Sequence, residues 1–141
     1  MMKLTFDPTR PIYLQIMEWL KQRAARGDLR PGDQVPSVRE LAHELQVNPN
    51  TVARAYRELE REGFLFTLRG QGTFVTRDPE RISRERQQLF QRALEGFLQA
   101  LQELHPSPKE VARLLEDLQR ALRTAASSAP EKTTPEKEAS E

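Results

Sequence analysis

The sequence predicts a mainly α-helical fold with one small β-hairpin, and three observations support it. Apolar residues recur at helical spacing before residue 63 and again after residue 83, and a short β-prone stretch lies between these regions. Capping residues stand where the helices should begin, and glycines follow where they should end. We therefore expect three helices, a hairpin and then two further helices.

Composition limits the classes of protein to consider. The chain has 141 residues, of which 37% are hydrophobic and 30% are charged, as expected for one domain or a small domain with an appendage. No apolar run approaches the roughly 20 residues of a membrane span, and no secretory pattern opens the chain. The absence of cysteine excludes disulfides, thiolate metal sites and cysteine nucleophiles. A cytoplasmic protein with no membrane partner is expected.

The first helix should follow Pro11 and end at Gly27. Trp19 is expected to be a partly buried core or interface residue. The turn at residues 29–33 contains Gly32, which can take a positive φ. The apolar residues at helical spacing, which should face the core, are Tyr13, Ile16, Met17, Leu20 and Ala24.

Two capped helices should follow. Ser37 and Glu40 form a capping-box signature that starts the second helix. Asn48 followed by Pro49 is the start signal of the third helix, and Gly63 is its stop signal. The apolar face of the second helix is Val38, Leu41, Ala42 and Leu45.

The third helix has two distinct faces. Its apolar residues are Val52, Ala55, Tyr56 and Leu59, and the residues opposite them are Asn50, Arg54, Arg57 and Arg61. One amide and three guanidinium groups near a helix start are what reading the DNA major groove requires. Taken alone, however, this polar stripe is more typical of an ordinary solvated face, because glutamates are interleaved with its arginines. The flanking sequence has to decide between these interpretations.

A β-hairpin should follow the third helix directly. Residues 64–68 and 73–76 are rich in β-formers, and the glycines at 70 and 72 suit a tight turn between them. Phe64, Phe66 and Phe74 are expected to contribute to the core. The tip can then approach another molecule, although a hairpin that only seals the core is the alternative.

The remainder should form a helical hairpin. Asp78-Pro79 is expected to break the chain, Ser83 to open one helix, and a capping box of Ser107 and Glu110 to start the next. The residues expected at a dimer interface are Phe90, Leu94, Phe97, Leu101, Leu104, Val111, Leu115, Leu118 and Leu122. Packing of this hairpin against its own N-terminal domain is the alternative.

The predicted organisation has three parts. Residues 1–77 form a winged helix-turn-helix domain, residues 78–126 a helical hairpin for dimerisation, and residues 127–141 a disordered acidic tail. Residues 1–76 carry 11 Lys+Arg against 9 Asp+Glu, which is only a weak indication of nucleic-acid binding. Dimerisation would double this excess.

The sequence lacks the parts of an enzyme or a metal site. No histidine stands beside a placed acid, and residues 69–72 form a hairpin turn rather than a phosphate-binding loop. His43 and His105 lie on different elements, so no metal or other cofactor is expected. Residues 83–125 are too few to enclose a metabolite. Any small-molecule effector should therefore bind between the domain and the helical hairpin or at the dimer interface.

Five segments resemble the N-terminal domain of GntR-family bacterial transcription regulators. They are residues 11–16 (PIYLQI), 27–42 (GDLRPGDQVPSVRELA), 47–56 (VNPNTVARAY), 59–63 (LEREG) and 69–75 (RGQGTFV). The short helical C-terminal part resembles the YtrA subfamily. The resemblance implies a homodimeric repressor that reads a near-palindromic operator in double-stranded DNA. A winged-helix protein-interaction or architectural module that does not read sequence is the alternative.

The resemblance also implies which residues contact DNA. Arg39 corresponds to the arginine of the family's Pro-Ser-x-Arg segment. The hairpin corresponds to the family's wing, and its tip at residues 70–73, the wing tip, resembles one that enters the minor groove. Many relatives have Arg where Pro49 and Ala53 stand here, so their base contacts do not transfer directly. Arg54 and Arg57 are expected from the polar stripe of the third helix rather than from the resemblance, whereas Arg61 is expected to be structural. The expected set is Ser37, Arg39, Asn50, Thr51, Arg54, Arg57, Arg69, Gly70, Gln71, Gly72 and Thr73.

Overall fold

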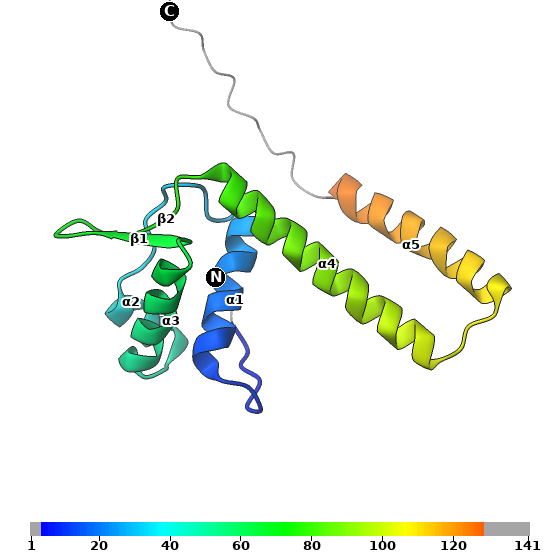
Figure 1. Ribbon diagram of the computed structural model, residues 1–141, viewed down its shortest axis with the longest axis horizontal. Helices are drawn as coiled ribbons and strands as arrows, with labels where there is room; N and C mark the ends of the chain where they lie inside the picture. Colours follow the sequence, from blue (N-terminus) through cyan, green and yellow to red (C-terminus); the bar gives the residue numbers. More distant parts are fainter. Residues whose placement is uncertain (1–3, 129–141) are drawn as a thin grey trace, which may run out of the picture. The chain divides into compact units, whose positions relative to one another are not determined.

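The computed structural model describes residues 4–128 and has the expected order of elements (Figure 1). The elements are α1 (Ile12–Ala25), α2 (Val38–Leu45), α3 (Pro49–Arg61), β1 (Leu65–Leu68), β2 (Gly72–Val75), α4 (Pro79–Glu103) and α5 (Pro108–Ser128). The chain forms two compact units, Met1–Glu95 and Gly96–Glu141, so α4 begins in the first unit and ends in the second. The predicted fold class, mainly α-helical with one small β-hairpin, is confirmed.

The capping residues fix the starts of α2 and α3. The Ser37 Oγ accepts a 3.1 Å hydrogen bond from the Glu40 amide, and a Glu40 carboxylate oxygen accepts one of 3.3 Å from the Ser37 amide. The Asn48 Oδ1 accepts a 2.8 Å hydrogen bond from the Asn50 amide, with Pro49 at the first helical position. Both predicted helix starts are confirmed, because these side chains satisfy amides that no helical carbonyl can reach.

The three N-terminal helices enclose the core of the first unit. All four residues predicted to face inward from α3 are buried, whereas Tyr13 and Trp19 of α1 are only half-buried. The bend between α3 and β1 adds Phe64, which is fully buried. The buried cluster comprises Ile16, Met17, Leu20, Ala24, Leu29, Val35, Leu41, Ala42, Val52, Ala55, Tyr56, Leu59, Phe64, Leu65 and Val75.

The hairpin pairs β1 with β2 in antiparallel register and leads away from the three helices (Figure 1). Phe66 and Phe74 are register partners whose rings stack with centroids 5.5 Å apart. Both rings are half-buried, so they cover the core from its edge rather than fill it as Phe64 does. The chain before α2 bonds to the other edge of β2, since the Val35 amide donates to the Thr73 carbonyl oxygen at 2.9 Å.

Helix α4 begins at Pro79, four residues before the predicted start at Ser83. The Asp78 Oδ1 accepts a 3.0 Å hydrogen bond from the Glu80 amide. Asp78-Pro79 is therefore an N-cap followed by a first-turn proline, and its prediction as a chain break was wrong.

A buried charge cluster holds the start of α4 in the first unit. Glu85 is only 3% exposed, and its carboxylate lies 3.6 Å from Lys21 Nζ and 3.4 Å from an Arg81 guanidinium nitrogen. Lys21 also pairs with Glu62 at 2.6 Å. Next along α4, Arg86 donates a 2.5 Å hydrogen bond to the Ala25 carbonyl oxygen. These contacts join α1, the end of α3 and α4, and nothing in the apolar pattern predicted them.

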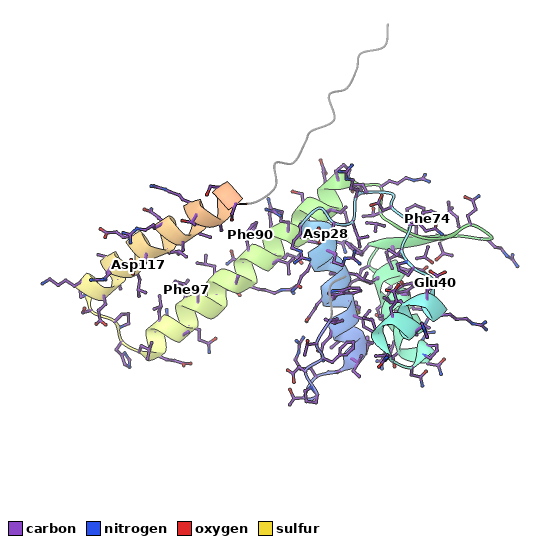
Figure 2. The ribbon with its side chains drawn as sticks, turned by 180° about the vertical axis from the view of Figure 1, so that it is seen from behind. Asp28, Glu40, Phe74, Phe90, Phe97 and Asp117 are labelled. Atoms are coloured by element: carbon purple, nitrogen blue, oxygen red, sulfur yellow. The ribbon has the colours of Figure 1, made fainter. Side chains whose placement is uncertain are left out.

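Most of the residues predicted for dimerisation are apolar side chains exposed to solvent on α4 and α5. Eight of the nine are exposed, from Val111 at 37% to Leu104 at 77%, and Leu101 is half-buried. Figure 2 marks two of them, Phe90 and Phe97, along α4. The capping box of Ser107 and Glu110 is present before α5, with bonds of 3.1 and 3.2 Å. The acidic tail was predicted to begin at residue 127, but α5 continues through Ser127 and Ser128, so that boundary was wrong; the rest of the predicted tail, from position 129 onward, lies outside the described residues.

Candidate nucleic-acid interface

The outward face of α3 carries the predicted polar stripe. Asn50, Arg54, Arg57 and Arg61 are all exposed. Arg61 forms an ion pair with Glu58 at 3.5 Å. Within residues 4–128, Arg57 has no ion-pair partner. The charge that the stripe can offer to another molecule is therefore concentrated toward the start of α3.

The start of α2 is fixed against α3 by one buried hydroxyl. The Tyr56 hydroxyl donates a 2.7 Å hydrogen bond to the Pro36 carbonyl oxygen. Burial raises the pKa of Tyr56 above its ordinary value, and the negative charges of Glu40 and Glu44 add to the increase. The phenol is therefore neutral and able to donate at any physiological pH. It positions Ser37 and Arg39, both of which are exposed.

The wing tip is held from two sides. On one side, Gln34 Nε2 donates a 3.2 Å hydrogen bond to the Gln71 carbonyl oxygen. On the other side, the Thr67 hydroxyl bonds to both the Glu60 carboxylate of α3 and the Thr73 hydroxyl. The tip residues at 69–71 are exposed, whereas Gly72 and Thr73 are half-buried. The tip can thus face another molecule without being a loose loop.

The backbone conformation favours glycine at position 72. Its φ of +129° lies where side chains are rarely tolerated, and a Cβ built there would also push aside the amide end of the Gln34 side chain. Gly70 has a φ of +78° but open space around it. The sequence predicted a tight turn, and the structure adds that Gln34 packs against it.

Arg54 is engaged by the neighbouring helix. Its guanidinium carbon lies 3.9 Å from the centroid of the Tyr13 ring of α1, which is a cation–π contact. Glu58, four residues further along α3, pairs with Arg61 instead. Within residues 4–128, Arg54 therefore has an aromatic partner and no ion pair.

The structure brings the predicted contact residues to three neighbouring elements, namely the start of α2, the outward face of α3 and the wing tip. Sequence reasoning missed the residues that support them, which are Tyr13, Gln34 and Tyr56. Tyr13 and Tyr56 had been placed by periodicity as apolar core residues, although a tyrosine hydroxyl at a core edge usually finds a polar partner. Gln34 carried no signal, because its contact spans 37 residues of sequence.

Other kinds of site find no support among residues 4–128. No group of three or more histidine, cysteine, aspartate or glutamate residues is arranged there to hold a metal ion. None of the helices in this range is both long enough and apolar enough to span a membrane. A hollow of about 210 Å³ lies between α1 and α4 within the first unit, lined by residues that include Ala25, Arg86 and Phe90.

Three packed helices, a hairpin after the third and an exposed basic stripe on that helix define a winged helix-turn-helix protein. Residues 12–75 match the model of the bacterial regulatory proteins of the gntR family. The chain belongs to the GntR family.

The chain matches most of the length of several relatives. It is 43% identical to the uncharacterized HTH-type transcriptional regulator YhcF of Bacillus subtilis, over 75% of this chain and 88% of that protein. It is 39% identical to the HTH-type transcriptional repressor YtrA of Bacillus subtilis, over 77% of this chain and 92% of that one. A GntR-family transcriptional regulator from Listeria monocytogenes superposes with a TM-score of 0.73 at 34% identity, covering 79% of this chain and 98% of that one. The relatives are YtrA- and YhcF-type regulators, not enzymes.

Proposed function

We propose that this protein is a sequence-specific DNA-binding transcription repressor that acts as a homodimer. The observation that carries the proposal is the exposed stripe of α3, where the guanidinium groups of Arg54 and Arg57 have no carboxylate partner among residues 4–128 and stand with the Asn50 amide beside a braced wing tip. Such groups can form bidentate hydrogen bonds to base edges and phosphates. The similarity to a repressor supports the repressor role.

Each element has its own proposed contact. The outward face of α3, with Asn50, Thr51 and Arg57, enters the major groove, where an amide suits adenine and a guanidinium suits guanine. Arg39 and Ser37 at the start of α2 contact phosphates, which fix register without reading sequence. The exposed tip from Arg69 to Gln71, followed by Gly72 and Thr73, enters the minor groove. These contacts would take place in the bacterial cytoplasm.

Dimerisation is proposed from the exposed apolar side chains of α4 and α5. Large apolar groups such as Phe90, Phe97 and Leu115 are 61%, 40% and 55% exposed. Exposed apolar side chains in this number usually mark an interface, and a second copy offers matching side chains by symmetry. A dimer would place two recognition helices about 34 Å apart, one helical turn of DNA.

Footprinting tests the proposed function. The full chain is titrated onto the DNA upstream of its own gene and onto a scrambled fragment of the same composition, at physiological salt. Protection of two half-sites one helical turn apart, absent from the scrambled fragment, is expected. Equal binding to both fragments would refute sequence-specific regulation.

Two variants distinguish the sequence-specific regulator from the alternative, a winged module that does not read sequence. Arg39→Ala should weaken binding to all DNA alike, and Asn50→Ala should change base preference at one position of each half-site, at a cost of about 1–3 kcal/mol. The alternative would be favoured if both variants left DNA binding unchanged while a protein partner was lost.

A further inference from the structure

The cation–π contact with Tyr13 directs Arg54 toward α1 and so sets it apart from the other polar residues on the outward face of α3. The inference drawn from it rests on the proposed DNA-binding function and refines the role of Arg54. From sequence, Arg54 was expected to read a base. The structure places its guanidinium on α1, at the flank of the stripe.

The two flanks of α3 are identified by their contacts. On one flank, the Glu60 carboxylate bonds to Thr67 of β1, so this side faces the wing. On the other flank, Arg54 lies over Tyr13 of α1. At 100° per residue, Glu60 and Arg54 are about 120° apart around the helix axis. Asn50 and Arg57 lie between them, in the direction that the floor of a groove would occupy.

The position of the Arg54 guanidinium over the Tyr13 ring favours a phosphate partner. A guanidinium held over an aromatic ring still has N–H donors that can reach outward past the ring edge. A groove floor would meet Asn50 and Arg57, whereas the flank would meet the sugar–phosphate strand that borders the groove. Planar bidentate donors match the geometry of two phosphate oxygens.

We infer that Tyr13 and Arg54 form a clamp for the DNA backbone. Tyr13 is the positioning residue, because its half-buried ring holds the guanidinium in place before DNA arrives. Arg54 donates to a phosphate on the strand next to α1 and reads no base. Pre-positioning reduces the side-chain entropy that binding would otherwise cost.

The test uses the full chain with its footprinted operator and the scrambled fragment, and measures affinity by fluorescence anisotropy over a range of salt. Arg54→Ala should weaken binding to both DNAs by the same factor, leaving their ratio unchanged. The log–log salt slope should fall by about 0.9 for each monomer, the contribution of one neutralised phosphate. Tyr13→Leu should shift affinity in the same direction, and Tyr13→Phe, which keeps the ring, should behave as wild type.

A double-variant cycle separates positioning from a second, independent contact. Tyr13→Leu should weaken binding no further when Arg54→Ala is already present, because the ring then has nothing to hold. Arg61→Ala is the matched control, since this arginine lies on the same face but pairs with Glu58. It should leave affinity and salt slope unchanged. Arg54→Ala decides the inference even if Tyr13→Leu fails to fold, which circular dichroism would reveal.

The outcomes distinguish the clamp from the proposed function. A lower operator-to-scrambled ratio for Arg54→Ala, or an unchanged salt slope, would overturn the clamp and leave the regulator intact. Independent, additive effects of Tyr13→Leu and Arg54→Ala would overturn the positioning role. Equal wild-type affinity for both DNAs would refute sequence-specific reading, whereas the clamp would still be measured by the loss of affinity in Arg54→Ala.

Discussion

The hydroxyl of Tyr56 donates a 2.7 Å hydrogen bond to the carbonyl oxygen of Pro36, joining the middle of α3 to the residue before the Ser37 cap. Both helices of the helix-turn-helix are therefore oriented by a polar contact as well as by apolar packing. Tyr56 is only 5% exposed, so no water easily replaces the bond. The contact residues on α2 and α3 depend on it for their relative placement.

Tyr56→Phe should destabilise the fold without reshaping it. The ring remains in the core, but the Pro36 carbonyl oxygen loses its donor, at a cost of about 1–2 kcal/mol. Urea unfolding followed by circular dichroism measures the change. Thr124→Val is a suitable control, because it removes an exposed hydroxyl that bonds within α5. An unchanged midpoint for Tyr56→Phe would show that the bond contributes nothing.

The raised pKa of Tyr56 leads us to expect that the folded protein loses stability in alkaline solution. Burial raises the pKa of Tyr56 in the folded state, so the folded protein holds this proton more tightly than the unfolded chain does. The stability that the Tyr56 proton contributes is complete below the pKa of about 10 in the unfolded chain, and it is lost as pH rises from there through the pKa in the folded state. The difference in unfolding free energy between wild type and Tyr56→Phe should therefore shrink above about pH 10. A difference that stayed constant would contradict the raised pKa.

Gly72→Ala should disturb the wing tip more than Gly70→Ala. Both substitutions force a side chain into a positive-φ conformation, at a cost of about 1–2 kcal/mol at Gly70 and a higher cost at Gly72, whose φ of +129° lies beyond the left-handed region. Only the Cβ at position 72 also displaces Gln34 and removes its bond to the Gln71 carbonyl oxygen. Gly72→Ala should consequently lose more stability and more DNA affinity than Gly70→Ala, as measured by urea unfolding and anisotropy. Equal effects of both variants would mean that the Gln34 contact does not position the tip.

Glu85→Gln should loosen the start of α4. The substitution removes the negative charge that Lys21 and Arg81 share, but both cations retain some access to solvent. We expect a loss of about 2 kcal/mol, below the range for a fully buried pair. Glu80→Gln, an exposed change in the same helix, serves as the control. Hydrogen exchange should become faster in the first turns of α4, and equal exchange in both variants would argue against the cluster.

Local signals in the sequence predicted most of the fold. The caps at Ser37, Asn48 and Ser107 work within three residues of chain, so their chemistry is visible in the sequence itself. The inward face of α3 follows directly from helical periodicity. The outward stripe was visible for the same reason, but its division between the wing side and the α1 side was not.

What the sequence did not predict depends on contacts between distant segments. The buried Glu85 looks like any surface glutamate until Lys21 and Arg81 are placed around it. Likewise, Gln34 and Tyr13 acquire their roles only when the wing and α1 are positioned in space. Asp78-Pro79 was misjudged for a different reason, because the same two residues can end one element or cap the next.

Phe97→Glu should convert the proposed dimer into a monomer. Phe97 is 40% exposed in the single chain, so a charge there costs the monomer little, whereas an apolar dimer interface would have to bury it unpaired. Light scattering after size-exclusion chromatography measures the mass. Affinity for a two-half-site operator should fall by about 100-fold, because the two half-sites would no longer be bound by linked copies. Affinity for a single half-site should not change. Gln99→Glu adds the same charge to an exposed polar position of α4 and should remain dimeric, whereas a dimeric Phe97→Glu would place the interface elsewhere.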